Sequence, residues 1–180
     1  RKESLQVSSV ASFFVSRVDT IFEQESDRLI KAGACAASDF EGLTSEIAIA
    51  NSLLAYEHFL KVQQSGRFQK LLKAGARIQR PLWASTSTKN PKLDPLHYVT
   101  RLAFAETVNT VPPVTLNAVL AAPDFKLNSE LNFEAARLML AQLVSAGVSF
   151  DYCLNRLEID GVKAFAESFE SLLSSISKKI

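Results

Sequence analysis

Three short segments rich in β-branched and aromatic residues alternate with longer stretches that carry helical patterns. The segments are residues 6–12, 76–84 and 107–111. β-branched and aromatic side chains fit the pleated surface of a strand, so each segment is predicted to be a strand. Strands that are joined through helices run parallel, with right-handed crossovers. This order predicts an α/β fold with a parallel sheet whose strands are buried on both faces.

Apolar residues three to four positions apart predict the helices. Within residues 43–62 they recur at 43, 47, 50 and 54 and again at 53, 56 and 60, which marks one side of a helix. The first strand is expected to break into a loop and then a helix, and Asp94-Pro95 to open a short helix ending near Leu102. Further helices are predicted over 67–74, 114–121, 131–146, 151–158 and 161–177, with Gly75 and Gly147 after helix ends and Asp151 as a cap.

The length of the chain, 180 residues, suits one domain spanning residues 1–180 but is short for a complete barrel. A (β/α)₈ barrel takes about 250 residues and eight strands, whereas three strands are predicted here. The chain is therefore either a small open three-layer α/β domain or part of a larger barrel. The short strands and abundant helix favour the second. The segment 5–18 also favours it, because it lacks the charges or proline that usually protect a free sheet edge.

The composition excludes several classes of function. Lys and Arg (20) nearly match Asp and Glu (19), for a net charge of +1, so no general nucleic-acid surface is expected. No apolar run approaches the roughly 20 residues that span a bilayer, so no membrane partner is expected. Cys35 and Cys153 have no Cys or His at ligand spacing. Neither a disulfide framework nor a zinc site is therefore expected, and a reducing intracellular compartment is.

Polar side chains follow each predicted strand, where the loops of a parallel α/β fold converge on ligands. They are Ser12, Phe14, Ser16 and Arg17 after the first strand, residues 85–90 after the second, and Asn109 and Thr110 after the third. Arg17 offers a planar fork for bidentate phosphate contact, Lys89 a compact point charge, and Ser12 and Ser85 hydroxyl donors. A phosphate dianion needs several such donors at once, so these residues predict an anion site.

An alternative interpretation makes the same residues solvated loop residues, with Arg17 paired to Asp19 or Glu23, and the residues alone leave both interpretations open. Asp19 fits a helix N-cap better than an acid–base role. His58 and His97 have no cysteine or Ser-x-Gly turn nearby and are expected on a helix surface or in packing. The sequence contains no P-loop, Gly-x-Gly-x-x-Gly or nucleophile elbow.

Two stretches resemble signature segments of transaldolases, most closely the longer branch of many bacteria and plant plastids. They are Val10-Ala-Ser-Phe-Phe-Val-Ser-Arg-Val-Asp19 and Gln79-Arg-Pro-Leu-Trp-Ala-Ser-Thr-Ser-Thr-Lys-Asn-Pro91. Tyr98-Val-Thr and Thr107-Val-Asn-Thr-Val-Pro-Pro113 are similar to the family's next strand and its approach to the last helices. Gly161-Val-Lys-Ala-Phe-Ala-Glu-Ser-Phe-Glu-Ser-Leu-Leu173 is similar to its C-terminal helix. The resemblance covers essentially the whole chain in register.

The resemblance implies the C-terminal portion, or the last three or so β/α units, of a (β/α)₈ barrel of the class I aldolase type. Such enzymes move a dihydroxyacetone unit from a ketose phosphate to an aldose phosphate in the pentose phosphate pathway. They use a lysine Schiff base and no metal or organic cofactor. Ser12, Phe14 and Arg17 match the family's substrate-pocket serine, aromatic and phosphate-binding arginine. Ser85 and Lys89 match its second phosphate contact, which is an arginine at slightly different spacing in the shorter bacterial branch.

The sequence also departs from the family. The family's Schiff-base lysine lies on an earlier strand and its acid–base carboxylates earlier still, so no catalytic residue is expected in this chain. Ala121-Ala-Pro-Asp-Phe replaces the usual Asp-His-Gly-like turn, and residues 19–44 match less closely. Two hypotheses follow. The chain is a fragment of a cytoplasmic or plastid transaldolase, completed by preceding polypeptide or another chain, or it is a non-catalytic relative that binds sugar phosphates or pairs with another subunit.

Overall fold

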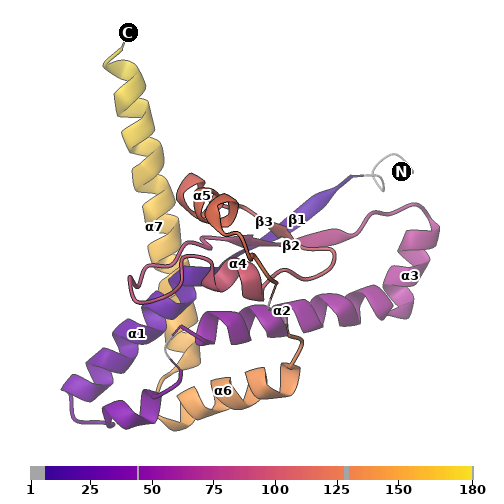
Figure 1. The fold of residues 1–180 in the computed structure, drawn as a ribbon. Coiled ribbons are helices and arrows are strands. Elements are labelled where there is room, and N and C mark those ends of the chain that lie inside the picture. The colour runs from indigo at the N-terminus through magenta and orange to yellow at the C-terminus, as the bar shows by residue number, and fades with distance from the viewer. Residues whose placement is uncertain (1–6, 44, 128–129, 180) are drawn as a thin grey trace.

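The computed structural model describes residues 7–43, 45–127 and 130–179, and three strands form its centre. They are β1 (Ser9–Phe14), β2 (Gln79–Ala84) and β3 (Val108–Asn109), in the order β1-β2-β3 (Figure 1). Both pairings are parallel, with Ser9 opposite Gln79 and Leu82 opposite Val108. The predicted parallel α/β sheet is confirmed.

The bounds of the strands differ from the prediction. β1 begins at Ser9 and continues to Phe14 instead of ending at residue 12, and β2 begins at Gln79 instead of 76. The two strands have the same length because each residue of one is paired with a residue of the other. β3 is limited to the two residues that pair with Leu82 and Trp83. Residue 6, predicted in the first strand, and Thr44, predicted in a helix, lie outside the described residues.

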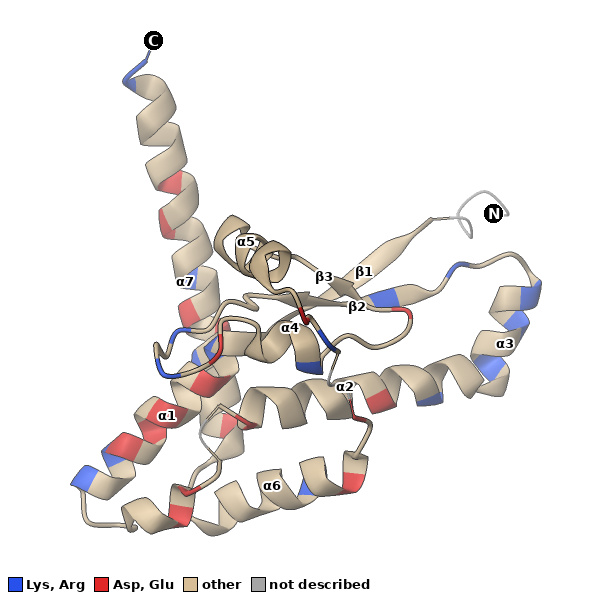
Figure 2. Ribbon diagram, viewed as in Figure 1, with Lys and Arg blue, Asp and Glu red and all other residues tan. Residues whose placement is uncertain are grey.

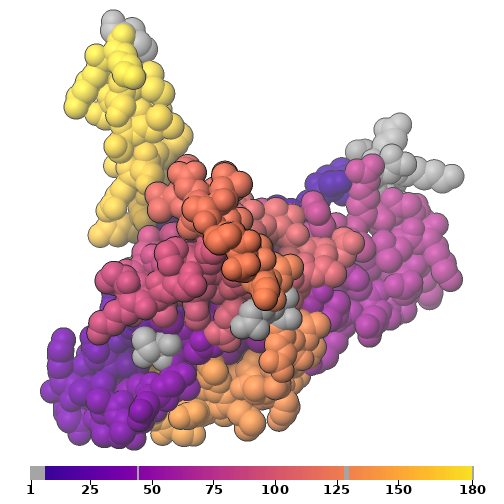
Figure 3. Space-filling model, viewed as in Figure 1, coloured from indigo at the N-terminus to yellow at the C-terminus, as the bar shows by residue number. Residues whose placement is uncertain are grey.

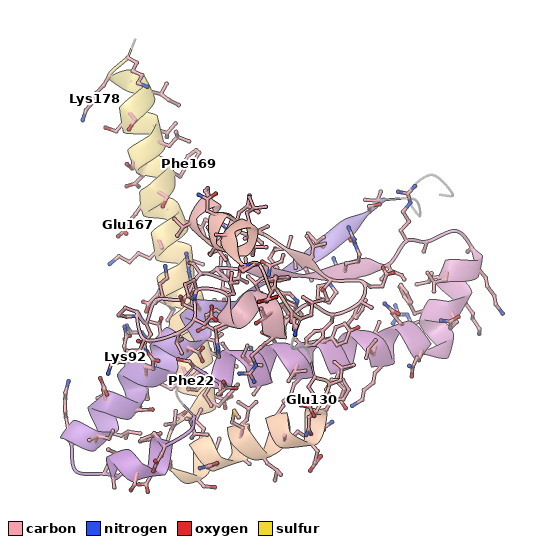
Figure 4. All side chains as sticks on the ribbon, viewed as in Figure 1. Phe22, Lys92, Glu130, Glu167, Phe169 and Lys178 are labelled. Carbon is pink, nitrogen blue, oxygen red and sulfur yellow. The ribbon has the colours of Figure 1, made fainter. Side chains whose placement is uncertain are left out.

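Helices connect the strands and form most of the molecule. They are α1 (Val15–Lys31), the 3-10 helix η2 (Ala37–Phe40), α2 (Ile47–Gln64), α3 (Gly66–Lys73), α4 (His97–Arg101), α5 (Pro113–Ala121), α6 (Phe133–Ser145) and α7 (Phe150–Ser177). α2 packs against α1 and α6, and α1 packs against α7. The Phe22 side chain of α1 (Figure 4) meets Phe150 at the start of α7, with ring centroids 5.1 Å apart.

One face of the sheet is closely packed. Phe13 and Trp83, which are neighbours on adjacent strands, have ring centroids 5.7 Å apart. Trp83 is fully buried, and its Nε1 donates a hydrogen bond to the backbone oxygen of Leu102 at 2.8 Å. A buried indole N–H needs such a partner. We call this side, with the α2 and α4 residues beneath it, the packed face.

The opposite face of β1 is open. Alternate residues of a strand point to opposite faces, so Val10, Ser12 and Phe14 share the side away from Phe13. Val10 is 41% exposed and Ser12 is exposed as well. The prediction that the first strand is buried is therefore wrong for this chain. A parallel strand is buried on both faces only where other elements cover both of them, and Val10 and Ser12 are not covered by the described part of the chain.

The start of α1 also differs from the prediction. α1 begins at Val15, immediately after β1, and no loop separates them. Asp19 was predicted to cap this helix, but it lies inside α1 and is 4% exposed. It accepts a hydrogen bond from the backbone N–H of Ala48, in the first turn of α2, at 2.7 Å. Asp19 therefore caps another helix, which sequence spacing cannot indicate.

Two later helices begin or continue differently from the prediction. α4 begins at His97, because the Asp94 side chain accepts from the Leu96 N–H at 2.8 Å within a turn that precedes the helix. α7 is one helix where two were predicted, and it continues through Gly161. One glycine costs a helix only about 1 kcal/mol, which the long flanking stretches offset. The cap of α7 is Ser149 and not Asp151, since the Ser149 Oγ accepts from the Tyr152 N–H at 3.3 Å.

The C-terminal part of α7 projects away from the rest of the molecule (Figures 1 and 3). Large apolar side chains on it and on α5 are exposed, namely Val114, Leu116 and Leu120 on α5 and Ile159, Val162, Phe165, Phe169, Leu172, Leu173 and Ile176 on α7. Apolar patches of this extent mark surfaces that contact other polypeptide or ligands. Within the described ranges, no helix has both the length and the hydropathy of a transmembrane segment.

Candidate functional site

The first turn of α1, which follows β1 directly, and the loop after β2 meet at a pair of serines. The Ser16 backbone N–H donates to the Ser85 backbone oxygen at 3.0 Å, and the two hydroxyl oxygens lie 2.9 Å apart. Ser85 has a φ of 57°, in the left-handed region that residues other than glycine seldom adopt. The bonds to Ser16 hold it there. The predicted convergence of the first two loops is therefore present, and Ser16 is the residue that makes the contact.

Arg17 and Lys89 line the same cavity, of about 410 Å³. Its other lining residues are Thr20, Ile21 and Gln24 of α1 and Leu157, Asp160 and Gly161 of α7. The lone acidic group among them, Asp160, is paired with Arg156 of its own helix at 3.3 Å. Two cationic side chains thus face a cavity whose single carboxylate already has a cationic partner. That charge arrangement favours an anion.

Phe14 connects this cavity to the open face of the sheet. The Arg17 guanidinium carbon lies 4.5 Å from the centre of the Phe14 ring, in the geometry of a cation–π contact. The same ring lies 6.0 Å from the Phe165 ring of α7. The pairing of Arg17 with Asp19 or Glu23, the alternative considered above, is not found among the described residues. Arg17 is instead held by an aromatic ring that leaves its donors available.

The structure separates the remaining predicted residues from this cavity. Ser12 lies on β1 opposite Leu82, exposed and on the same face as Phe14. Ser85 contacts Ser16 and does not belong to the described lining of the cavity. Phe14, Arg17 and Lys89 are therefore brought together. Ser85 contacts Ser16, the residue that precedes Arg17. Ser12 lies two residues before Phe14 on β1.

The end of β3 has a structural role in this chain. Thr86 is fully buried, and its hydroxyl donates to the side-chain oxygen of Asn109 at 2.8 Å. The Thr110 backbone N–H donates to the Trp83 oxygen at 3.0 Å. The loop after β2 is thus fixed to the end of β3. Asn109 and Thr110, which the sequence placed at a possible ligand position, hold the neighbouring strands together.

A buried carboxylate near the cavity was not recognised as such from the sequence. Asp19 accepts from the Tyr98 hydroxyl at 2.6 Å in addition to the Ala48 N–H. Burial raises the pKa of Asp19 to about 6, although both hydrogen bonds lower it. The pKa of Tyr98 is raised as well, by burial and by the negative charge of Asp19. The contacts of Asp19 come from residues 29 and 79 positions away, which no local pattern reveals.

His97, next to Tyr98, is a packing residue as predicted. Its Nε2 lies 3.0 Å from the Ser45 backbone oxygen and 3.7 Å from the Glu46 carboxylate. Glu46 also pairs with Arg101 of α4. These contacts hold α4 against the segment that precedes α2. His58 is exposed on α2, again as predicted.

A larger cavity lies elsewhere and has the wrong charge for a phosphate. It has a volume of about 690 Å³ and lies between α1 and the segment 37–47. Asp19, Glu23, Asp27 and Glu41 line it, and acidic side chains are concentrated along α1 (Figure 2). Burial and the neighbouring Asp27 raise the pKa of Glu23. Size alone would select this cavity, but its carboxylates would repel an anionic ligand.

Lysines decide whether an imine can form on this chain. Every lysine in the described ranges is exposed, namely Lys31, Lys61, Lys70, Lys73, Lys89, Lys92, Lys126, Lys163, Lys178 and Lys179. Water solvates an exposed ammonium and so favours its charged form over the neutral amine. Schiff-base lysines are instead made neutral by burial or by a neighbouring cation. The described part of the chain therefore has no lysine in such surroundings.

Comparison with known proteins identifies the family. The sequence model of the family described as Transaldolase/Fructose-6-phosphate aldolase matches residues 3–176. The chain belongs to this family. Transaldolases from Parafrankia sp. and Thermobifida fusca are 44% and 40% identical to it, each over 97% of this chain and 46% of the relative. Transaldolase from Trichodesmium erythraeum is 35% identical over 97% of this chain and 47% of its own length.

The chain spans about half the length of the curated transaldolases that it matches. The family has the (β/α)₈ barrel fold, and three adjacent parallel strands with their helices are part of such a barrel. This agrees with the preference for a partial barrel over a small open domain. It also accounts for the open face of β1 and the exposed apolar residues of α5 and α7.

Proposed function

We propose that this chain is the C-terminal part of a transaldolase and binds the phosphate groups of its sugar-phosphate substrates. The reaction transfers a dihydroxyacetone unit from a ketose phosphate to an aldose phosphate. The observation that carries the proposal is the shared cavity of Arg17, in the first turn of α1 directly after β1, and Lys89, in the loop after the neighbouring strand β2. Ligands of parallel α/β folds bind at this end of the strands.

Each residue of the proposed site has a distinct part in binding. The planar guanidinium of Arg17 takes two phosphate oxygens at once, and the Phe14 ring keeps it oriented without neutralising it. Lys89 adds a second positive charge from the loop after β2. Ser85 fixes the start of that loop through Ser16, and Ser12 on the open face offers a hydroxyl to the sugar. All of these residues bind, and none of them performs a chemical step.

The reactive groups of the proposed enzyme come from polypeptide outside this sequence. An imine requires a neutral amine, and every described lysine of this chain is exposed. The proposed chemistry proceeds through a lysine imine and requires neither a metal nor an organic cofactor. We therefore expect the 180-residue chain to be inactive by itself, and we expect the complete enzyme in the cytoplasm or in a plastid.

A second candidate function is non-catalytic, as a protein that binds sugar phosphates or pairs with another subunit. The exposed apolar residues of α5 and α7 agree with pairing. The intact mass of the natural product separates the candidates. A polypeptide with roughly 150 or more additional residues and a buried strand lysine supports the enzyme. A natural product of the present length supports the non-catalytic protein.

The binding site is tested by titrating fructose 6-phosphate into the chain and its variants. Arg17→Ala should weaken binding by about 1.5–3 kcal/mol, the scale of a hydrogen bond to a charged group. Arg77→Ala is the matched control, because Arg77 is exposed before β2, at the opposite end of the sheet, and donates to Ser8 at 2.8 Å. Equal affinities for the two variants would contradict the proposed site.

The absence of a reactive lysine is tested by borohydride reduction in the presence of fructose 6-phosphate. Reduction traps an imine as a stable amine, which intact-mass spectrometry detects. We expect no adduct on the 180-residue chain, since exposed ammonium groups do not attack a carbonyl at a useful rate. An adduct at a single lysine of this chain would overturn that part of the proposal.

A further inference from the structure

The loop that carries Lys89 is attached to α1 at both of its ends. Its start, Ser85, is bonded to Ser16 through the backbone at 3.0 Å and through the hydroxyls at 2.9 Å. Beyond its end, the Tyr98 hydroxyl of α4 donates to Asp19 at 2.6 Å. Ser16 and Asp19 are three residues apart, so they lie on one side of α1. Arg17 comes from the same turn of this helix.

We infer that the Asp19–Tyr98 hydrogen bond is a positioning contact, which holds the Lys89 loop against α1 so that Lys89 and Arg17 face one cavity. The inference rests on the proposed function, because it assigns this contact to the anion site. Asp19 and Tyr98 do not line that cavity among its described residues. They act through the loop and the helix that they join.

The burial of the pair supports this assignment. Asp19 is 4% exposed and Tyr98 is 2% exposed, so the hydrogen bond has little competition from water. The Ala48 N–H at the start of α2 fixes the second oxygen of Asp19 at 2.7 Å. The carboxylate therefore joins α1, α2 and α4 at one point. By contrast, the segment between Ser85 and α4 is polar, and Lys89 within it is exposed.

Other ionisable groups surround this point from each neighbouring element. They are Glu23 and Asp27 on α1, Glu41 and Glu46 in the segment leading to α2, and His97 and Arg101 on α4. Glu46 is paired with Arg101, whereas Glu23 adds negative charge near Asp19. Loss of the Tyr98 hydroxyl would leave Asp19 with the Ala48 N–H as its remaining hydrogen-bond donor among the described residues. The far end of the loop would then be held less firmly against α1, while its start stays bonded to Ser16.

Tyr98→Phe tests the inference, and Tyr56→Phe is its matched control. The Tyr56 hydroxyl donates to the Ala105 backbone oxygen at 3.1 Å, is also on a buried tyrosine, and lies away from the Lys89 loop. Both variants remove one hydroxyl from the full chain, and circular dichroism checks that each is folded. Sulfate is the anion probe, because it is doubly charged at neutral pH and does not titrate itself there.

Two measurements are expected to separate the variants. Tyr98→Phe should weaken sulfate binding about fivefold and speed hydrogen exchange of the amides in residues 86–96 about tenfold, as loss of a buried charged hydrogen bond implies. Tyr56→Phe should change neither by more than about twofold. Asp19→Asn should resemble Tyr98→Phe in the loop, since a neutral amide is a weaker acceptor than a carboxylate.

Arg17→Gln in the same titration separates a failure of the inference from a failure of the proposed function. If Arg17→Gln abolishes sulfate binding and Tyr98→Phe behaves like Tyr56→Phe, the inference is overturned and the proposed function stands. Faster exchange in Tyr98→Phe with unchanged sulfate binding would overturn the inference too. If Arg17→Gln leaves sulfate binding unchanged, the proposed site fails, and the positioning role fails with it.

Discussion

The two faces of the β1–β2 sheet differ sharply in how far their side chains are buried and hydrogen-bonded. On the packed face, Trp83 is fully buried and bonded to Leu102, and Asp19 and Tyr98 complete each other's hydrogen bonds nearby. On the open face, Val10 is 41% exposed, and Phe14 contacts Phe165 of α7, which is itself largely exposed. The packed face belongs to a closed hydrophobic core, whereas the open face leaves apolar side chains exposed.

This difference agrees with the proposal that the present part of the barrel binds phosphate and another part supplies the chemistry. The residues that orient Arg17 and Lys89 belong to contacts within the chain, so they do not depend on further polypeptide. In the proposed function, the substrate's carbon chain would lie on the open face, which has no lysine among its described residues. The proposal thus divides binding geometry and chemistry between two parts of the barrel.

The largest effect is expected from truncating Trp83 on the packed face. Trp83→Ala should lower the free energy of unfolding by about 3–5 kcal/mol, because it removes a fully buried indole and its hydrogen bond. Phe169→Ala on the projecting part of α7 should cost less than about 0.5 kcal/mol, because Phe169 is 61% exposed (Figure 4). Urea denaturation measures both. Similar losses would show that the open side is as well packed as the other.

The pH dependence of stability should report Asp19 next. Its pKa is raised from 3.8 to about 6, so the folded chain holds a proton more tightly than the unfolded chain. The stability due to this group is fully present below pH 3.8 and is lost as the pH rises through about 6. The loss is roughly 3 kcal/mol at most, from a shift of about two pKa units. Asp19→Asn should remove this part of the profile in denaturation measured from pH 4 to 8. A wild-type profile unchanged by the substitution would contradict the burial of this carboxylate.

A smaller effect is expected from the second cation of the site. Lys89→Gln should weaken sugar-phosphate binding by about 0.5–1.5 kcal/mol, less than Arg17→Ala, because an exposed ammonium is well hydrated and makes a single contact. Lys92→Gln is the control from the same loop, since Lys92 is exposed and does not belong to the described lining of the cavity (Figure 4). Calorimetric titration should separate the pair, and equal losses would reduce the role of Lys89 to general charge attraction.

The sequence indicated the fold where local rules decide it. Parallel strands followed from their separation by helices, and the helix ends at Gly75 and Gly147 followed from glycines that have φ values of 96° and 91°. Local spacing failed at Gly161, because the i,i+4 pairs Arg156–Asp160 and Lys163–Glu167 and the long flanks keep α7 continuous. A single weak helix former does not end a helix when the long stretches on both sides of it are helical.

The candidate site was predictable in its ligand types but not in its supports. Arg17, Phe14 and Lys89 were expected from their positions after strands, and they lie together. Ser16 and Tyr98 were not identified as supports, because their partners Ser85 and Asp19 are distant in sequence and become neighbours only through folding. Asp19 was assigned a local cap since Asp is common there, yet it caps α2. Long-range hydrogen bonds of this kind leave no periodic signal.

The central claim is that the start of α1 and the loop after β2 bind a phosphate group through Arg17 and Lys89. The most direct measurement is a nuclear magnetic resonance titration of the isotope-labelled chain with fructose 6-phosphate. We predict that the largest shifts occur at the backbone and guanidinium signals of residues 14–17 and 85–90. The largest shifts at the acidic cavity around Glu23 and Glu41, with residues 14–17 and 85–90 unchanged, would contradict the claim.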